Sequence, residues 1–286
     1  MPDIDLSYEF FPPRNEGQQR RFWHTLGNLE TLNPRYISVT WGALGSGSQA
    51  SLKVLEQLVA LTQVPVTAHL CCAGQTLAQM QDMVDRLENL GITRFLALRG
   101  DLTEETSSKL GEAATMHHAS DLVTLLAKKT NRHISVSAYP EVHPESESAQ
   151  TDLDWLKHKL DSGASTAITQ FFFEADTFLR FRDRAAAAGI TQPIVPGILP
   201  VHNIDNVLDF SKRCGATVPA KMVSRFKQAK SPKASDEIAV DHCASLCAEL
   251  HKEGVNAFHL YTLNKSNLSY RVSRELLGGS SAAEAA

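Results

Sequence analysis

Apolar and polar positions follow one repeated pattern along this chain: a short apolar run, a polar end, and then a segment with apolar residues at helical spacing. In residues 95–98 the apolar run stops abruptly at Arg99, Gly100 and Asp101. A short apolar run bounded by turn residues is typical of a buried strand, and apolar residues three or four apart are typical of a helix. The pattern therefore predicts strands that are each followed by a helix.

The strand-helix unit occurs eight times. The predicted strands span residues 6–10, 36–40, 64–70, 95–98, 134–138, 167–173, 194–199 and 257–261. The predicted helices span 18–32, 52–59, 77–87, 121–129, 151–160, a segment that ends near 189, 206–212, 220–227, 237–253 and 268–277. Thr76 and Ser120 are predicted N-caps, and Gly91 is a predicted helix stop.

Regular alternation of strands and helices predicts a parallel sheet with right-handed crossovers. Eight units in 286 residues favour a closed (β/α)8 TIM barrel with extra helices before the eighth strand. We expect residues 1–278 to form a single catalytic domain and 279–286 to be a disordered tail. An open doubly wound sheet is the alternative. Its nucleotide-binding form has Gly-x-Gly-x-x-Gly after the first strand, where this chain has Phe11, Pro12 and Pro13.

Composition and charge narrow the class of protein. The chain is 43% hydrophobic and 21% charged, with a net charge of −4 and no basic cluster, which argues against a nucleic-acid partner. No signal peptide and no apolar run long enough to cross a membrane are present, so we expect a cytoplasmic protein without membrane contact. Five cysteines without a Cys-x-x-Cys pair predict free, buried thiols.

Polar residues follow nearly every predicted strand, and barrel enzymes place their active sites at the carboxyl ends of the strands. These strand-end residues are Glu9, Thr40, His69, Arg99, Asp101, Tyr139, Gln170, the 200–203 loop, Tyr261 and Asn264. A solvated turn is the alternative for any single one of them.

Glu9 is the most unusual strand-end residue, because it lies inside an apolar strand where an ionised carboxylate needs partners. A carboxyl group kept protonated near neutral pH can act as a general acid. An ordinary strand glutamate paired with an arginine is the alternative.

Several histidines and aromatics have simpler interpretations. His259 lies amid a strand, where a satisfied core histidine is the commoner case, and residues 171–173 are expected in the core. His69 and His143 could join carboxylates around a metal, but no histidine pair has tight ligand spacing, so we predict no metal site.

Six strings, each at the end of a predicted strand, carry a family resemblance. They are YEFFPP at 8–13, LRGD at 98–101, AYPEVHP at 138–144, ITQFFF at 168–173, PGILP at 196–200 and FHLYTLN at 258–264. Together they resemble the methylenetetrahydrofolate reductase family, in its bacterial form, over nearly the whole chain to about Gly278.

The resemblance implies a barrel flavoenzyme that binds FAD tightly but non-covalently and without a Rossmann motif. Such an enzyme takes a hydride from NADH or NADPH and passes it to 5,10-methylenetetrahydrofolate in a ping-pong reaction. The product, 5-methyltetrahydrofolate, supplies methyl groups for methionine synthesis. The resemblance also implies a homo-oligomer, a tetramer or a dimer, and no regulatory domain of the eukaryotic type.

Residue by residue, the resemblance implies that Glu9 is the general acid and that Asp101 faces both flavin and pterin. The implied substrate contacts are Thr40, Gln170, Asn206, Phe210 and Lys265. The implied FAD contacts are Trp41, Ala43, His69, Arg99, Gly100, Asp101, His118, Ala119, Tyr139, His143, Ser146, Asp152 and Lys159.

Three positions depart from related bacterial enzymes: Trp41 and His118 stand where those often carry Tyr, and Lys265 where they often carry Arg. An ammonium cannot reproduce the two-pronged contact of a guanidinium, so the contacts of Lys265 are open. The sequence also leaves open the preference between NADH and NADPH and the length of the folate's glutamate tail. A metal-dependent barrel hydrolase and a non-catalytic folate- or flavin-binding protein stay as alternatives.

Overall fold

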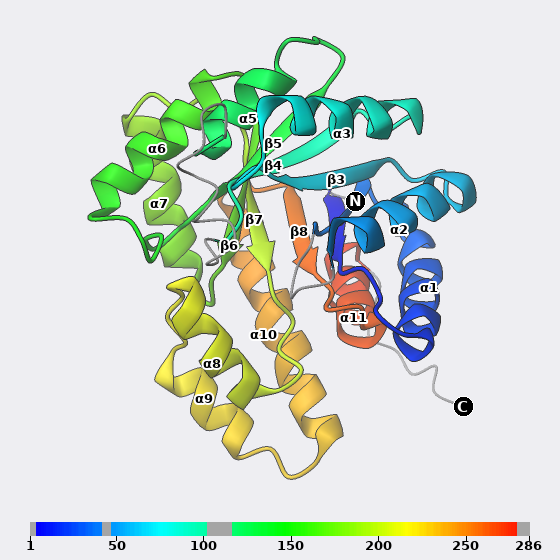
Figure 1. Cartoon of the computed structure of the whole chain (residues 1–286). Helices are drawn as coiled ribbons and strands as arrows, with labels where there is room; N and C mark the ends of the chain where they lie inside the picture. The colour runs from blue at the N-terminus through cyan, green and yellow to red at the C-terminus, as the bar shows by residue number, and fades with distance from the viewer. Residues whose placement is uncertain (1–3, 42–46, 102–115, 279–286) are drawn as a thin grey trace.

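The chain folds into a closed barrel of eight parallel strands in sequence order, as Figure 1 shows for the computed structural model, which describes residues 4–41, 47–101 and 116–278. The strands are β1 (Asp5–Phe10), β2 (Tyr36–Val39), β3 (Val66–Cys71), β4 (Arg94–Leu98), β5 (His133–Ala138), β6 (Thr166–Phe171), β7 (Ile194–Ile198) and β8 (Ala257–Tyr261). The predicted (β/α)8 barrel is therefore confirmed, and the open sheet is excluded.

Helices surround the barrel on its outside. They are α1 (Glu16–Glu30), α2 (Gly47–Leu61), α3 (Leu77–Asn89), α5 (Ala119–Leu126), α6 (Ala149–Asp161), α7 (Ala175–Ala187), α8 (Ile204–Cys214), α9 (Ala220–Lys227), α10 (Pro232–Lys252) and α11 (Ser266–Leu276). Helices α8, α9 and α10 all lie between β7 and β8, which confirms the predicted extra helices (Figure 1). In the part of the chain that the structure describes, no helix has the length and apolar character needed to cross a membrane.

Capping explains where the helix predictions succeed and fail. Thr76 caps α3 as predicted, and Gly91 after it has a positive φ of 87°. The cap predicted at Ser120 is wrong: α5 begins at Ala119, because the Asp121 carboxylate accepts the backbone N–H of His118 at 2.9 Å. Helix α10 begins five residues before the predicted start at 237, since Ser231 caps it and a proline suits the first turn.

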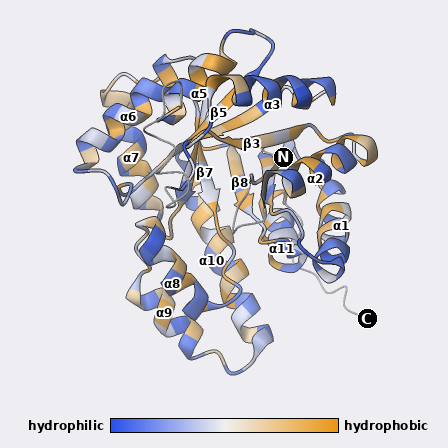
Figure 2. Ribbon diagram, viewed as in Figure 1, coloured by the Kyte–Doolittle hydropathy of each residue, from blue (hydrophilic) through white to orange (hydrophobic). Residues whose placement is uncertain are grey.

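Apolar residues form two separate cores. The larger one lies between the strands and the helices and includes Leu6, Tyr8 and Phe10 of β1. The smaller one, Tyr36, Leu96 and Ile168, joins β2, β4 and β6. Figure 2 shows hydrophobic and hydrophilic residues on different faces of the outer helices, as this arrangement requires.

Polar residues occupy many of the alternate strand positions. Ser7, Thr67, His69 and His259 are each at most 3% exposed, although barrel interiors are dominated by bulky branched apolar residues. All five cysteines are free, as predicted; Cys72, Cys243 and Cys247 are buried, whereas Cys71 and Cys214 are only half-buried. That residues 1–278 form one catalytic domain stays a prediction, and the predicted tail at 279–286 lies outside the described residues.

The first and last strands close the barrel. Ser7 pairs with His259 and Glu9 with Tyr261 in the register of β1 and β8. Beyond β8 the Asn264 side chain accepts the Phe11 N–H at 2.9 Å and donates to the Phe11 carbonyl at 2.7 Å. Asn264, which the strand-end pattern marked as a candidate for chemistry, therefore holds the two strand ends together.

We expect Asn264→Ala to lower the free energy of unfolding by about 2 to 3 kcal/mol, from two lost hydrogen bonds and a left-handed backbone that alanine disfavours. Asn33→Ala is the matched control, because Asn33 has a similar positive φ, 49° against 55°, on the exposed surface. The control should cost about 1 kcal/mol or less. Urea titration measures both, and equal losses would contradict the role of the Asn264 side chain.

Candidate active site

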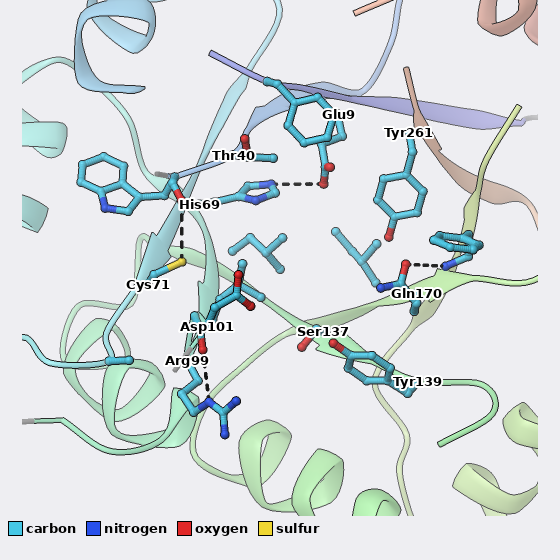
Figure 3. A pocket seen from close by; sticks show the side chains of 18 of the residues that line it. Glu9, Thr40, His69, Cys71, Arg99, Asp101, Ser137, Tyr139, Gln170 and Tyr261 are labelled. Atoms are coloured by element: carbon cyan, nitrogen blue, oxygen red, sulfur yellow. Dashed lines mark hydrogen bonds and ion pairs between the residues drawn. The ribbon is translucent and has the colours of Figure 1, made fainter. Parts of the chain in front are cut away.

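A cavity of about 620 Å³ opens among the strands and the loops that follow them (Figure 3). The structure brings eleven of the singled-out residues to its wall: Glu9, Thr40, Trp41, His69, Arg99, Gly100, Asp101, Tyr139, Gln170, Phe210 and Tyr261. They come from β1, β2, β3, β4, β5, β6, β8 and α8 or the residues just after these strands. The polar strand ends therefore meet in one place, as expected from parallel strands.

Glu9 lies between two buried histidines. Its Oε2 atom is 3.7 Å from His69 Nε2 and 3.9 Å from His259 Nε2, and its side chain is only 12% exposed. Burial lowers the pKa of His69 to about 4, so this imidazole is neutral at pH 7. The neighbours of the Glu9 carboxylate are therefore two imidazoles, and not the arginine that the alternative interpretation assumed. Figure 3 shows Glu9 and His69 pointing toward each other.

Only one of the two ring nitrogens of the buried His259 has a hydrogen-bond partner among the described residues. Its Nδ1 atom lies 2.8 Å from Ser7 Oγ, but its Nε2 atom is buried and has no hydrogen-bond partner among the described residues. His69 Nε2 is also without one. Both unpartnered nitrogens face the same carboxyl oxygen.

The other polar side chains of the cavity differ in which hydrogen-bonding groups remain available to a ligand. The Tyr261 hydroxyl donates to the Thr169 carbonyl at 2.6 Å, and burial raises its pKa well above the usual value, so this hydroxyl keeps its proton. A Cβ atom on Gly197 would lie 2.6 Å from the Tyr261 ring, which explains the glycine. Gln170 accepts the Phe171 N–H with Oε1 at 3.0 Å, and its amide NH₂ group is left as a donor for the cavity.

The Arg99 to Asp101 turn forms one edge of the cavity. Arg99 makes a two-pronged ion pair with Glu145, with distances of 2.7 and 2.9 Å. This pair raises the pKa of Arg99 and lowers that of Glu145. Gly100 has φ of 90°, and a Cβ atom there would lie 2.9 Å from Cys71 Cβ, so only glycine fits the turn. Asp101 is exposed at the cavity wall.

Another predicted group gathers beside the cavity, in the loop before α6. Asp152 accepts the His143 backbone N–H at 3.1 Å and the Ser146 hydroxyl at 3.2 Å, so its carboxylate shapes this loop. Lys159, two turns further along α6, donates to the Ser137 carbonyl at 2.6 Å. Burial lowers the pKa of Lys159 to about 8, although Asp152 opposes the shift.

Comparison with known proteins identifies the family. A model of "Methylenetetrahydrofolate reductase" matches residues 2–277. The chain belongs to the methylenetetrahydrofolate reductase family. It is 39% identical over 274 residues to the 5,10-methylenetetrahydrofolate reductase of Pectobacterium carotovorum subsp. carotovorum, and 38% identical to that of Escherichia coli (strain K12). Each alignment covers 96% of this chain and 90% of the relative. Membership makes the protein a folate oxidoreductase.

A solved structure supports the fold alone. An uncharacterized protein from Clostridium thermocellum, described as binding two copies of 5-methyl-5,6,7,8-tetrahydrofolic acid, aligns with a TM-score of 0.65 at 12% identity. The alignment covers 96% of both chains. The barrel of this reductase-family member therefore recurs in a protein of distant sequence.

The remaining predicted residues that the structure of this reductase-family chain describes are not part of the cavity wall. His118 caps α5 and stacks on Trp155, with ring centroids 4.8 Å apart, and Ala119 follows it. Asn206 lies one helical turn before Phe210 on α8 and is exposed. Lys265, also exposed, occupies the N-cap position of α11 without a capping hydrogen bond from its side chain. Ala43 lies outside the described residues.

Sequence reasoning missed several residues at or near the site. Trp155 is 41% exposed and lies one turn after Asp152 on α6, a helical spacing that could have drawn attention to it. Phe171 was expected in the core; it is buried, but it also lines the cavity and stacks on Phe210 at 5.4 Å. Further lining residues, which were not predicted as site residues, are Phe11, Cys71, Ala73, Gln75, Leu96, Leu98, Ser137, Ile168, Leu199 and Leu263.

Within residues 4–41, 47–101 and 116–278, no group of three or more His, Cys, Asp or Glu side chains is placed to hold a metal ion.

The lowered pKa of Lys159 predicts a pH dependence of stability. A lysine whose pKa falls from 10.5 to about 8 on folding destabilises the protein below pH 8, and this cost disappears as pH rises toward 10.5. Relative to Lys159→Met, wild type should therefore gain about 2 kcal/mol of unfolding free energy between pH 7 and pH 10. Lys157→Met, which removes an exposed partner of Asp161, is the control and should show no such gain. A constant difference for Lys159→Met would refute the lowered pKa.

Proposed function

We propose that this protein reduces 5,10-methylenetetrahydrofolate to 5-methyltetrahydrofolate, with FAD as bound cofactor and NADH or NADPH as reductant, in a ping-pong reaction. The observation that carries the proposal is the Glu9 carboxyl, which is almost buried yet lines the cavity beside a neutral His69. A carboxyl in such a place can hand a proton to a ligand nitrogen, which is the step that folate reduction needs.

The residues present fit a flavin dinucleotide. Thr40 Oγ1 and His69 Nε2 are buried polar atoms without a hydrogen-bond partner among the described residues, and both side chains belong to the cavity wall. Gly100 has no side chain, so a cofactor could approach the backbone closely where the chain turns after β4. The volume of about 620 Å³ falls in the range of cofactor pockets, roughly 300 to 1,000 Å³.

Charged residues would hold the anionic part of that cofactor. Arg99 presents a guanidinium whose two-pronged geometry suits phosphate oxygens, and Lys159 adds a positive charge along α6. Binding of a diphosphate to Arg99 would displace Glu145, which takes that place now. Bound FAD would supply the hydride-transfer chemistry, while the protein supplies placement and electrostatics.

The protein's own part in the folate step is the transfer of one proton. Glu9 would protonate a nitrogen of the substrate's five-membered ring, so that the ring opens and its methylene carbon becomes an iminium that can accept hydride. The carboxyl O–H bond breaks and a carboxylate remains, which a solvent proton later neutralises. His69 is neutral at pH 7, so it places no positive charge next to the Glu9 carboxyl.

Other cavity residues would orient the two substrates in turn. The stacked rings of Phe171 and Phe210 offer a flat apolar face, and Phe210 is 37% exposed at the mouth. The amide NH₂ of Gln170 and the carboxylate of Asp101 can hydrogen-bond a pterin or a nicotinamide amide. One aromatic surface serving two flat substrates fits a reaction in which the first product leaves before the second substrate binds.

Anaerobic spectroscopy of the purified protein tests this function. We expect yellow protein that NADH or NADPH bleaches, and whose colour returns in full when 5,10-methylenetetrahydrofolate is added in stoichiometric amount. Running each nicotinamide separately also determines the preferred reductant. Yellow protein that never bleaches would indicate a binding protein, and colourless protein containing zinc would indicate a hydrolase; either result contradicts the proposal.

A further inference from the structure

His259 lies behind Glu9 as seen from the cavity. It is fully buried and does not belong to the cavity wall. Its Nε2 atom is 3.9 Å from Glu9 Oε2 and has no hydrogen-bond partner in the described part of the chain. A buried ring nitrogen without a partner is costly, so such an atom calls for an explanation. Glu9 is the acidic group that it faces.

Hydrogen bonds around Ser7 indicate which ring nitrogen carries the proton. The Ser7 hydroxyl donates to the Phe258 carbonyl at 3.3 Å, and its oxygen lies 2.8 Å from His259 Nδ1. A hydroxyl has a single proton and the Phe258 carbonyl can only accept, so both contacts are hydrogen bonds only when the Nδ1–H group donates to Ser7. In that tautomer Nε2 carries a lone pair, and the lone pair faces Glu9.

Among the groups around His259, His69 also faces Glu9, with its Nε2 atom 3.7 Å from the same Oε2 atom. His69, from β3, is neutral at pH 7, since burial lowers its pKa to about 4. Burial raises the pKa of Tyr36, from β2, and of Tyr261, on β8 itself, so both keep their protons. Arg94, from β4, lies over the Tyr36 ring at 4.7 Å. From β7 the paired residue is Gly197, which has no side chain.

We propose that His259 is a positioning residue for the acid step: Ser7 fixes its tautomer, and its Nε2 lone pair, 3.9 Å from Glu9 Oε2, favours the acid form of that carboxyl. This inference rests on the proposed function of Glu9. In the acid form, the Glu9 O–H group would be directed toward Nε2. When the proton passes to the folate nitrogen, the Glu9 O–H bond breaks, and Nε2 is left with its lone pair. A solvent proton entering through the cavity restores the acid form after product release.

The pH profile of the folate half-reaction tests the proposal. Pre-reduced protein is mixed with 5,10-methylenetetrahydrofolate, and the return of flavin absorbance is followed as a function of pH in wild type, Ser7→Ala and His259→Gln. Weaker retention of the Glu9 proton should move the falling limb of the profile by about one unit to lower pH. At neutral pH the folate step should then be about tenfold slower. The nicotinamide half-reaction should be unchanged in both variants.

Ser273→Ala is the matched control. Ser273 is also buried, and its hydroxyl accepts a hydrogen bond from a β1 side chain, Tyr8, at 2.9 Å. Tyr8 belongs to the outer core rather than to the cavity wall, so the control should keep the wild-type profile.

Three outcomes would overturn the inference: variants with the wild-type profile, an equal shift in the control, or loss of the nicotinamide half-reaction in both variants, which would mean that the pair only supports the fold. If wild type itself fails to reoxidise with the folate, the proposed function fails instead. The two failures are therefore distinguishable.

Discussion

The pairing of β1 with β8 is the constraint on which the site depends. It brings the two ends of the chain into register, so that Ser7 lies opposite His259 and Glu9 opposite Tyr261. Thr262 donates to the Glu9 carbonyl at 2.6 Å, and Asn264 holds the backbone of Phe11 just beyond it. Without this closure the Glu9 carboxyl would lack the His259 imidazole, which β8 carries.

A polar barrel interior is the second consequence of that closure. The outward residues of β1 fill the apolar layer under the helices, while Ser7 and Glu9 alternate with them and face other strands. Buried polar groups strengthen electrostatic effects because the surrounding dielectric is low. The same burial keeps His69 neutral, and Nε2 of both histidines has no hydrogen-bond partner among the described residues, so the proposed acid Glu9 lies between two imidazole nitrogens.

Much of this architecture could be predicted from the sequence, for stated physical reasons. Strand and helix periodicities gave the eight units, and the rule that parallel strands share one active end gave Glu9, Thr40, Arg99 and Gln170. The partners of these residues could not be found in the same way. Glu145 and Arg99 are 46 positions apart, and Ser7 and His259 are 252 apart. Such contacts follow from strand register and loop path, which periodicity does not encode.

The helix ends and the cavity wall show the same limit. Ser120 had the right chemistry for a cap, but the side chain of Asp121 moved the start of α5 to Ala119. Phe171 was apolar enough for the core and is indeed buried, yet its ring also forms cavity wall beside Phe210. Whether a buried aromatic also borders a cavity depends on which part of the barrel is not filled by side chains of the other strands. The sequence of one strand does not contain this information.

Glu9→Gln offers the most direct measurement of the central claim, that one buried carboxyl gives the proton in folate reduction. Glutamine has nearly the same shape as glutamate but no acidic proton. The two half-reactions of the variant are followed separately by flavin absorbance under anaerobic conditions. The account predicts unchanged reduction by the nicotinamide and a folate step slower by about 100-fold or more. Equal losses in both half-reactions, or an unimpaired folate step, would contradict it.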